Sequence, residues 1–253
     1  MDCEETEHEI HEAFEIKEDD ELYTVDICPS KKHVIFGGKS ETAEVYSYEE
    51  ERAITRIEEF SDSVIYAKFV SENRFVIVTT DGTIALMEHS GDVCIVDLEE
   101  DISVAKFSEK LVVGASSGRV YLYDACLEHI NTLGGHSSEI ISVDYKEGRI
   151  LSMCANYLIA HDEQGRVLYT LKASEAYAFK YITSDVICFA RDGKIQIFKQ
   201  TRKLFEHNIE ERVEDVEIVG KSLAVGGEFD YILLIDTTGH YATFKLDVKT
   251  ELT

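Results

Sequence analysis

The sequence ISVAKFSEKLVVGASSGRVYLYDACLEHINTL, residues 102–133, contains four short apolar runs that are separated by polar turns. The runs are ISVAKF (102–107), LVVGA (111–115), RVYLYD (119–124) and HINTL (129–133). Short alternating runs bounded by Gly, Asp, Ser and Lys are typical of β-strands rather than helices. The stretch therefore predicts four consecutive short strands.

The same four-run unit recurs along the chain at spacings of 36 to 42 residues. Four short strands per period of about 40 residues are the sequence signature of a β-propeller blade. A single blade leaves its faces uncovered, so successive blades must pack around a common centre. We predict an all-β propeller with six four-stranded repeats in one domain, residues 19–253. The units begin near Asp20, Asp62, Asp101, Ser138, Glu175 and Glu211.

An acidic segment, residues 1–18, precedes the repeats. Within it, EIHEAFEIKE (9–18) places Ile10, Phe14 and Ile16 at even-numbered positions, which fits the period of a strand. Such a strand would close the ring beside the last unit. Six units are visible in the sequence, and seven blades are the alternative count. The alternatives are a helix that lies across one face of the disc and a flexible segment, and the sequence leaves these interpretations open.

The repeats resemble WD40 repeats in their dipeptides. Gly135-His136 stands where that family carries Gly-His, and Asp81-Gly82 and Asp192-Gly193 match its tight turn between the second and third strands. Tyr123-Asp124, His161-Asp162 and Ile235-Asp236 stand where the family carries Trp-Asp. The resemblance implies structural roles for His136, which would hold a loop by hydrogen bonding, and for Asp124.

Within the WD40 families the first three units look most like the angio-associated migratory cell protein group. The similarity lies in CPSKKHVIFGGKSETAEVYSY (28–48), FVIVTTDGTIALM (75–87) and SVAKFSEKLVVGASSGRVYLYD (103–124). That group includes a yeast dedicated chaperone of a basic large-subunit ribosomal protein. The resemblance implies that this chain escorts a newly made ribosomal protein of the L-ten family toward the large subunit.

The charge of the chain restricts its partners. Fifty acidic and 25 basic residues give a formal net charge of −25. Such a protein repels a nucleic-acid backbone and attracts a basic protein. The sequence contains no apolar run of about 18 residues, which a membrane-spanning helix would need. Its six cysteines form no CxxC pair and indicate reduced thiols. We therefore expect a monomer in the cytoplasm and the nucleus, with no direct nucleic-acid or membrane contact.

Three stretches imitate sites of catalysis or ligand binding. Asp124, Cys126, His129 and His136 are close in sequence, but the strand register separates them between a strand and two opposite rims. GGKS (37–40) precedes a strand, whereas a phosphate-binding loop needs a helix there. HEIHE (8–12) has its histidines three residues apart, unlike the zinc motif HExxH. We therefore predict no enzyme activity, no metal and no cofactor.

The excess of acidic residues falls on one side of the predicted disc. Loops that join fourth to first strands share a rim with loops that join second to third strands. These loops hold 18 acids and 3 bases, whereas the opposite loops hold 12 of each. We call the first set the acidic rim and predict that it binds protein, with Phe60 and Phe229 as apolar anchors. Its predicted acidic residues are Asp19, Asp20, Glu21, Glu41, Glu59, Asp62, Asp81, Glu99, Glu100, Asp101, Glu139, Glu175, Asp192, Glu210, Glu211, Glu228 and Asp230.

These observations favour a non-catalytic propeller that captures a basic protein segment on the acidic rim. The alternative is a scaffold subunit of a nuclear pore, chromatin or RNA-processing complex, which would need no peptide specificity. An enzyme would need chemical groups that converge at the centre of the disc, and the sequence motifs do not supply them.

Overall fold

The computed structural model describes most of the repeat region, and the account below concerns the described residues. These are residues 20–30, 32–58, 60–91, 93–174, 176–191, 193–209, 213–219, 222–227, 231–236 and 241–245. The predicted closing strand in residues 9–18 lies outside them. Within the described ranges no helix is long and apolar enough to cross a membrane.

Six four-stranded antiparallel sheets follow one another along the chain, each with its strands in sequence order. The first three sheets are β1 (Leu22–Ile27), β2 (His33–Gly38), β3 (Ala43–Ser47) and β4 (Arg52–Ile57); β5 (Val64–Ser71), β6 (Arg74–Thr79), β7 (Thr83–Glu88) and β8 (Val93–Asp97); and β9 (Ile102–Phe107), β10 (Leu111–Ala115), β11 (Val120–Tyr123) and β12 (His129–Leu133).

The other three sheets repeat this arrangement. They are β13 (Ile140–Lys146), β14 (Arg149–Cys154), β15 (Tyr157–Asp162) and β16 (Val167–Lys172); β17 (Ala176–Thr183), β18 (Val186–Arg191), β19 (Lys194–Lys199) and β20 (Arg202–Asn208); and β21 (Val213–Val219), β22 (Ser222–Gly227), β23 (Tyr231–Asp236) and β24 (Tyr241–Lys245). The six predicted four-strand repeats and the all-β propeller fold are thus confirmed.

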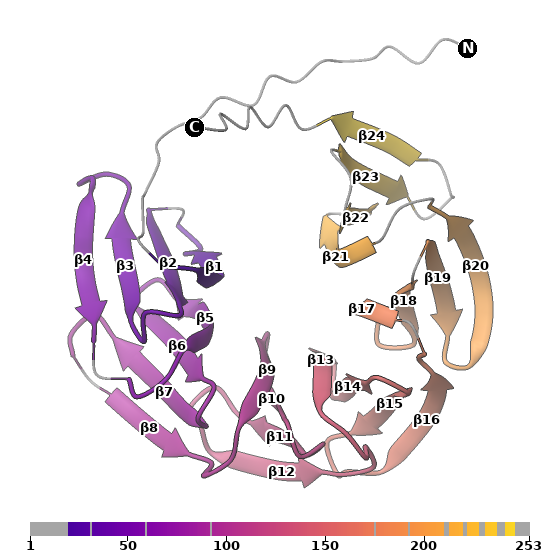
Figure 1. The fold of residues 1–253 in the computed structure, drawn as a ribbon, viewed down its shortest axis with the longest axis horizontal. Helices are drawn as coiled ribbons and strands as arrows, with labels where there is room; N and C mark the ends of the chain where they lie inside the picture. Colours follow the sequence, from indigo (N-terminus) through magenta and orange to yellow (C-terminus); the bar gives the residue numbers. More distant parts are fainter. Residues whose placement is uncertain are drawn as a thin grey trace.

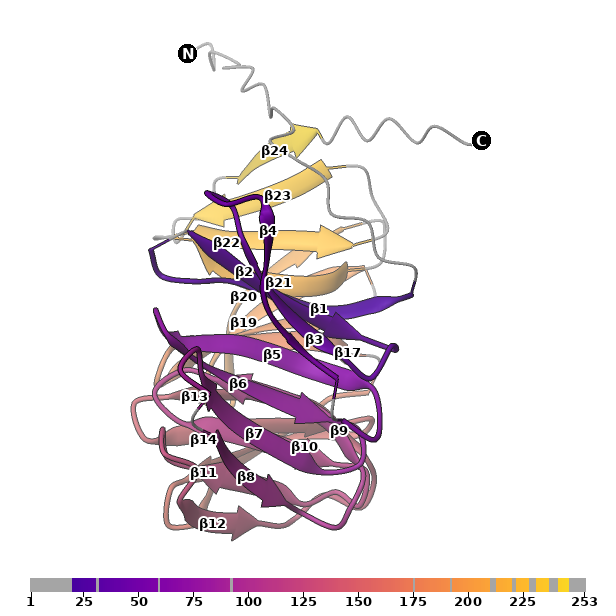
Figure 2. The same ribbon diagram turned by 90° about the vertical axis from the view of Figure 1, so that its left-hand side faces the viewer.

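The sheets stand around a common centre like the blades of a propeller. Figure 1 shows that β1, β5, β9, β13, β17 and β21 line the centre, while the fourth strand of each sheet lies outermost. Figure 2 shows the ring from its side, with the first three sheets toward the viewer. The inner strands of successive sheets contact each other from β1 to β21.

Strand β6 shows how the sequence pattern produces this packing. Phe75, Val76, Ile77 and Val78 are all fully buried, because a blade has a neighbour on both faces. Successive strand side chains point to opposite faces, so Phe75 and Ile77 pack against the first sheet. Val76 and Val78 pack against the third sheet. Continuous apolar runs in the second strands therefore reflect burial on both sides of the sheet.

The ring has an open side in the described structure. Figure 1 shows that the sheet β1–β4 and the sheet β21–β24 are the two ends of the series and are separated from each other. We call this region, between the first and sixth sheets, the open side. The other five sheet-to-sheet junctions are filled by buried apolar side chains.

Candidate functional site

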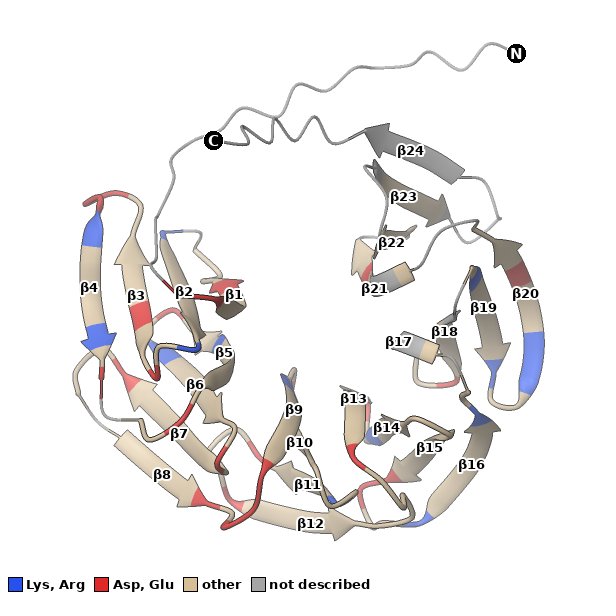
Figure 3. Cartoon of the chain, viewed as in Figure 1, with Lys and Arg blue, Asp and Glu red and all other residues tan. Residues whose placement is uncertain are grey.

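Backbone hydrogen bonds bring the loops of the acidic rim together. Thr80 N donates to Ser63 O at 3.0 Å, and Ile102 N donates to Thr80 O at 2.8 Å. Ser116 N donates to Asp101 O at 2.9 Å, which continues the chain of contacts toward the third sheet. Fourth-to-first loops and second-to-third loops thus lie on the same side of the disc. Figure 3 marks the positions of Asp and Glu in red, including those in the loop between β8 and β9.

Nine of the predicted rim acids lie within the described residues. Six of them are exposed: Asp20, Glu21, Glu41, Glu99, Asp101 and Glu139. Asp62, Asp81 and Glu100 are half-buried. The predictions for Asp19, Glu59, Glu175, Asp192, Glu210, Glu211, Glu228, Asp230 and Phe229 fall on residues outside the described ranges.

Asp81 holds its own loop together. Its carboxylate accepts a hydrogen bond from Ser61 Oγ, one from Thr79 Oγ1 at 2.5 Å and one from Thr83 N at 3.2 Å. Burial alone would raise the pKa of Asp81, but these donors outweigh it and hold the pKa below its ordinary value. Asp81 therefore stabilises the rim, and its charge is already compensated by hydrogen bonds.

Glu100 is likewise occupied by neighbouring groups. Its carboxylate accepts hydrogen bonds from Tyr121 Oη and, at 2.6 Å, from Ser117 Oγ. It also lies 3.7 Å from a guanidinium nitrogen of Arg119. These contacts join the loop before β9 to the turn before β11. The six exposed acids present their charge to solvent.

Phe60 is half-buried and packs against the apolar core between the first and second sheets. It therefore contributes to the sheet junction, and its role as an apolar anchor for a partner stays a prediction.

The two rims differ in how their acids are paired. Among the described acids of the opposite rim, six contact a cationic side chain: Glu49, Glu50, Glu88, Asp162, Glu163 and Asp185. Of the nine acidic-rim residues, only Glu100 lies within 4.0 Å of a described Lys or Arg. Nearby cations thus offset more of the negative charge on the opposite rim than on the acidic rim.

The two residues with predicted structural roles lie at opposite ends of their sheets. His136 follows β12 on the acidic rim, and its Nε2 is 2.8 Å from Ser152 Oγ in β14. Asp124 follows β11 on the opposite rim, where its Oδ1 accepts hydrogen bonds from Cys126 N and Glu128 N at 2.8 and 2.9 Å. Their separation explains why Asp124, Cys126, His129 and His136 form no ligand cluster, although they are close in sequence. No group of three or more metal-ligating side chains occurs among the residues that the structure describes.

A set of charged residues at the centre of the disc was missed from the sequence. The fifth residue of every inner strand is charged, and we call these six residues the central charge set. They are Asp26, Lys68, Lys106, Asp144, Lys180 and Glu217. A signal for them was present, since the same position is charged in all six repeats.

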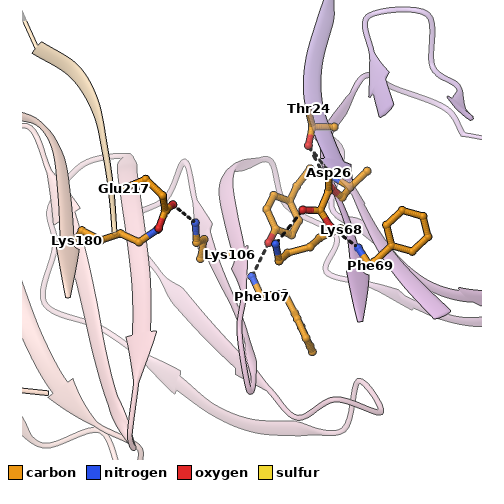
Figure 4. A network of polar contacts seen from close by, with 10 residues as sticks. Thr24, Asp26, Lys68, Phe69, Lys106, Phe107, Lys180 and Glu217 are labelled. Atoms are coloured by element: carbon orange, nitrogen blue, oxygen red, sulfur yellow. Dashed lines mark hydrogen bonds and ion pairs between the residues drawn. The ribbon is translucent and has the colours of Figure 1, made fainter. Parts of the chain in front are cut away.

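The central charge set links sheets that are distant in sequence. Figure 4 shows Lys106 and Lys180 converging on Glu217, at 3.9 and 2.5 Å from its Oε2. These contacts tie the third and fifth sheets to the sixth. Elsewhere Lys68 Nζ lies 3.0 Å from Asp26 Oδ1, which joins the first two sheets.

Two aspartates of this set also bind backbone. Asp26 Oδ2 accepts from Phe69 N at 2.9 Å, and Asp144 Oδ2 accepts from Tyr181 N at 2.8 Å. In each case the donor belongs to the next sheet along the chain. Tyr66 Oη accepts the equivalent bond from Phe107 N at 2.7 Å. At three of the five junctions an inner-strand side chain thus accepts a hydrogen bond from the backbone of the neighbouring inner strand.

The pKa directions follow from this packing. Burial, together with the adjacent Lys180 ammonium, lowers the pKa of Lys106. Burial would lower the pKa of Lys180 too, but the carboxylate of Glu217 outweighs it and raises that pKa. Burial raises the pKa of Asp144, although the Tyr181 amide and both lysines act in the opposite direction. The set consists of mutually compensating ion pairs, as expected for a structural network.

Comparison with known proteins agrees with this architecture. The model of the WD40-like domain matches residues 20–252. Sqt1 of Saccharomyces cerevisiae superposes with a TM-score of 0.75 at 15% identity, covering 90% of this chain and 76% of that one. The computationally designed protein Ika8 superposes with a TM-score of 0.71 at 18% identity, covering 89% and 71%. No curated protein sequence matches the chain. The chain has six four-stranded sheets, and the family model matches nearly all of its repeats. The chain therefore belongs to the WD40-like domain family.

Proposed function

We propose that this propeller binds a basic protein segment on its acidic rim and has no catalytic role. The observation that carries the proposal is the contrast in ion pairing: six described acids of the opposite rim contact a cationic side chain, against one, Glu100, on the acidic rim. A surface of one sign focuses its field and speeds the capture of an oppositely charged partner. A Lys/Arg-rich segment is the chemistry that matches this surface.

The specific partner follows from the sequence resemblance of the first three units. We infer that the segment belongs to a newly made large-subunit ribosomal protein of the L-ten family, and that the chain acts as its chaperone in ribosome assembly. Ribosomal proteins bind RNA through basic surfaces, so an acidic escort would shield such a surface before assembly. This role places a monomeric protein in the cytoplasm and the nucleus.

The free energy of each ion pair between the rim and the basic segment determines the expected affinity. An exposed ion pair contributes only about 0.2–1 kcal/mol, so no single carboxylate on the rim can dominate binding. Several pairs must act together, and their sum weakens as salt increases. Binding through this rim is therefore expected to be strongly salt-dependent.

Charge reversal on the acidic rim tests the proposal. Replacing the exposed Asp20, Asp101 and Glu139 together by lysine is expected to weaken binding of a Lys/Arg-rich 20-residue peptide by about tenfold or more. The reason is that three attractive contacts become repulsive. Fluorescence anisotropy at 50 and 300 mM salt measures both the affinity and its salt dependence.

The matched control reverses the same number of exposed acids on the opposite rim, namely Glu72, Glu109 and Glu128. This variant has the same net charge as the first but is expected to retain affinity within about twofold. Equal losses from the two variants would mean that overall charge, and not the rim, attracts the peptide. A stable complex from cells that is insensitive to salt would instead favour the scaffold alternative.

A further inference from the structure

The first sheet exposes an inner-strand position that is buried in every other sheet. The fourth residue of the inner strand faces the preceding sheet. In β1 this residue is Val25, which is 68% exposed. At the same position Ala67, Ala105, Val143, Phe179 and Val216 are at most 6% exposed. Val25 is exposed because no sheet precedes the first one in the described structure.

The sixth position of the inner strand shows the same difference. Ile27 is 53% exposed, whereas Phe69, Phe107, Tyr145 and Tyr181 are at most 7% exposed. Val34 and Phe36 pair with Ile27 and Val25 across β1 and β2, so they lie on the same face of the sheet. The first sheet thus carries a core-type apolar face whose innermost strand is uncovered.

The sixth sheet is incompletely covered on its side of the opening. Ala224 pairs with Glu217, the fifth residue of its inner strand, and is half-buried. The residues in the same place in the other sheets are Ile35, Val76, Val112, Leu151 and Cys188, and all five are fully buried. Both faces that border the open side therefore lack part of the apolar contact found at the five other junctions.

The uncovered face is continuous with the acidic rim. Tyr23 lies two residues before Val25, at an irregularity in the pairing of β1 with β2, and is 48% exposed. Its hydroxyl donates to Glu21 Oε2 at 3.2 Å. Asp20, Glu21 and Glu41 are all exposed at this end of the sheet. A ligand that lies along β1 would meet apolar side chains first and carboxylates at the rim.

We propose that the basic segment of the proposed function is amphipathic and docks along β1 on the open side. Its apolar side chains cover Val25 and Ile27, and its lysines or arginines reach Asp20 and Glu21. This inference rests on the proposed function and specifies the chemistry and the position of the bound segment. Burial of apolar area adds the affinity that exposed ion pairs alone do not provide.

Charge complementarity favours this occupant over two others. A second copy of the chain carries the same net charge of −25 and the same rim acids. The chain's own residues 1–18 contain eight acids and one lysine, so they would bring like charge to Asp20 and Glu21. A cationic partner has the charge that the site lacks.

Two probe peptides test the proposal on the full chain. One alternates lysine with leucine over 16 residues, and the other has serine in place of each leucine. The lysine-leucine peptide is expected to bind at least about tenfold more tightly than the lysine-serine peptide. The double variant Val25→Ser/Ile27→Ser is expected to remove this difference while leaving the affinity for the lysine-serine peptide within about twofold.

The control variant is Val93→Ser/Ile95→Ser, which removes two equally exposed apolar side chains from the outer strand β8. It is expected to bind both peptides like the unmodified protein. If neither peptide binds the unmodified protein, the proposed function itself fails. If both peptides bind equally well and the β1 variant behaves like the control, only the present inference is overturned.

Thiol labelling tests whether residues 1–18 or a second copy of the chain covers the exposed face of β1. In a background with Cys3, Cys94 and Cys126 replaced by serine, Val25→Cys is expected to react rapidly with a maleimide in the isolated protein and slowly with the lysine-leucine peptide bound. Protection that disappears when residues 1–18 are deleted would show that the chain covers its own face. Protection that rises with protein concentration would show a second copy. Either result would overturn the proposal.

Discussion

Replacing Asp144 by alanine is expected to lower the free energy of unfolding by about 3 kcal/mol. Asp144 is 5% exposed, and its Oδ2 accepts the hydrogen bond from Tyr181 N at 2.8 Å. The alanine variant leaves this buried N–H without its acceptor. It also removes a carboxylate that favours the charged forms of Lys106 and Lys180. Urea unfolding at pH 7 measures the loss.

Two further variants separate the contributions to this loss. Asp144→Asn keeps an oxygen that can accept from Tyr181 N, so it is expected to cost about 1 kcal/mol less than the alanine variant. Asp124→Ala also removes an acceptor of two backbone N–H groups, but in a turn on the opposite rim where water replaces it. It is expected to cost about 1 kcal/mol. Equal losses for Asp144→Ala and Asp124→Ala would contradict a structural role for the central charge set.

The fold was predictable because its signals are local and repeated. Period-two alternation gives the strands, and the spacing of 36 to 42 residues gives the sheets. The loop order alone assigned the acidic loops to one rim. What the sequence does not contain is which acids are internally bonded. Asp81 and Glu100 look like any other rim acid until Thr79, Ser117 and their other donors are placed in space.

The contacts of the central charge set and the exposure of β1 could not be predicted from the sequence, for a different reason. Each charged residue of the central charge set alternates with apolar neighbours, which is ordinary for a strand, and only the ring brings Lys106 next to Glu217. Val25 and Ile27 read as core residues, because the corresponding positions in the other five repeats are also apolar. Their exposure depends on there being no sheet before the first one among the described residues, which no local pattern reports.

Stability is expected to fall as the pH is lowered from about 6.5 to about 5, above the range in which ordinary carboxylates titrate. Burial, with a smaller contribution from His161, lowers the pKa of His136 from its ordinary value of 6.5 to about 4. Burial also lowers the pKa of His161, which is 1% exposed and has its Nε2 3.1 Å from Gly134 O. Folding therefore favours the neutral form of both rings.

The sign follows from proton counting. Below pH 6.5 the unfolded chain binds a proton at each histidine, whereas the folded chain does not until about pH 4 at His136. Proton uptake by the unfolded state lowers the free energy of unfolding as the pH falls through this window. Because His136 is partly exposed, we expect it to contribute about 2 kcal/mol, less than the full shift would give. Below this window the lowered pKa values of Asp81 and Glu163 add a separate loss.

The variant His136→Gln/His161→Gln tests this assignment. Glutamine can hydrogen-bond to Ser152 and to the Gly134 carbonyl but does not titrate. Urea unfolding at pH 7.5, 6.5, 5.5 and 5.0 is expected to show a smaller decline between pH 6.5 and 5.0 for the variant than for the unmodified protein. His89, whose pKa burial also lowers, accounts for the decline that remains. If both proteins lose the same stability over that interval, His136 and His161 are not buried in neutral form. The packing of the loop 134–139 against β14 and β15 would then have to be revised.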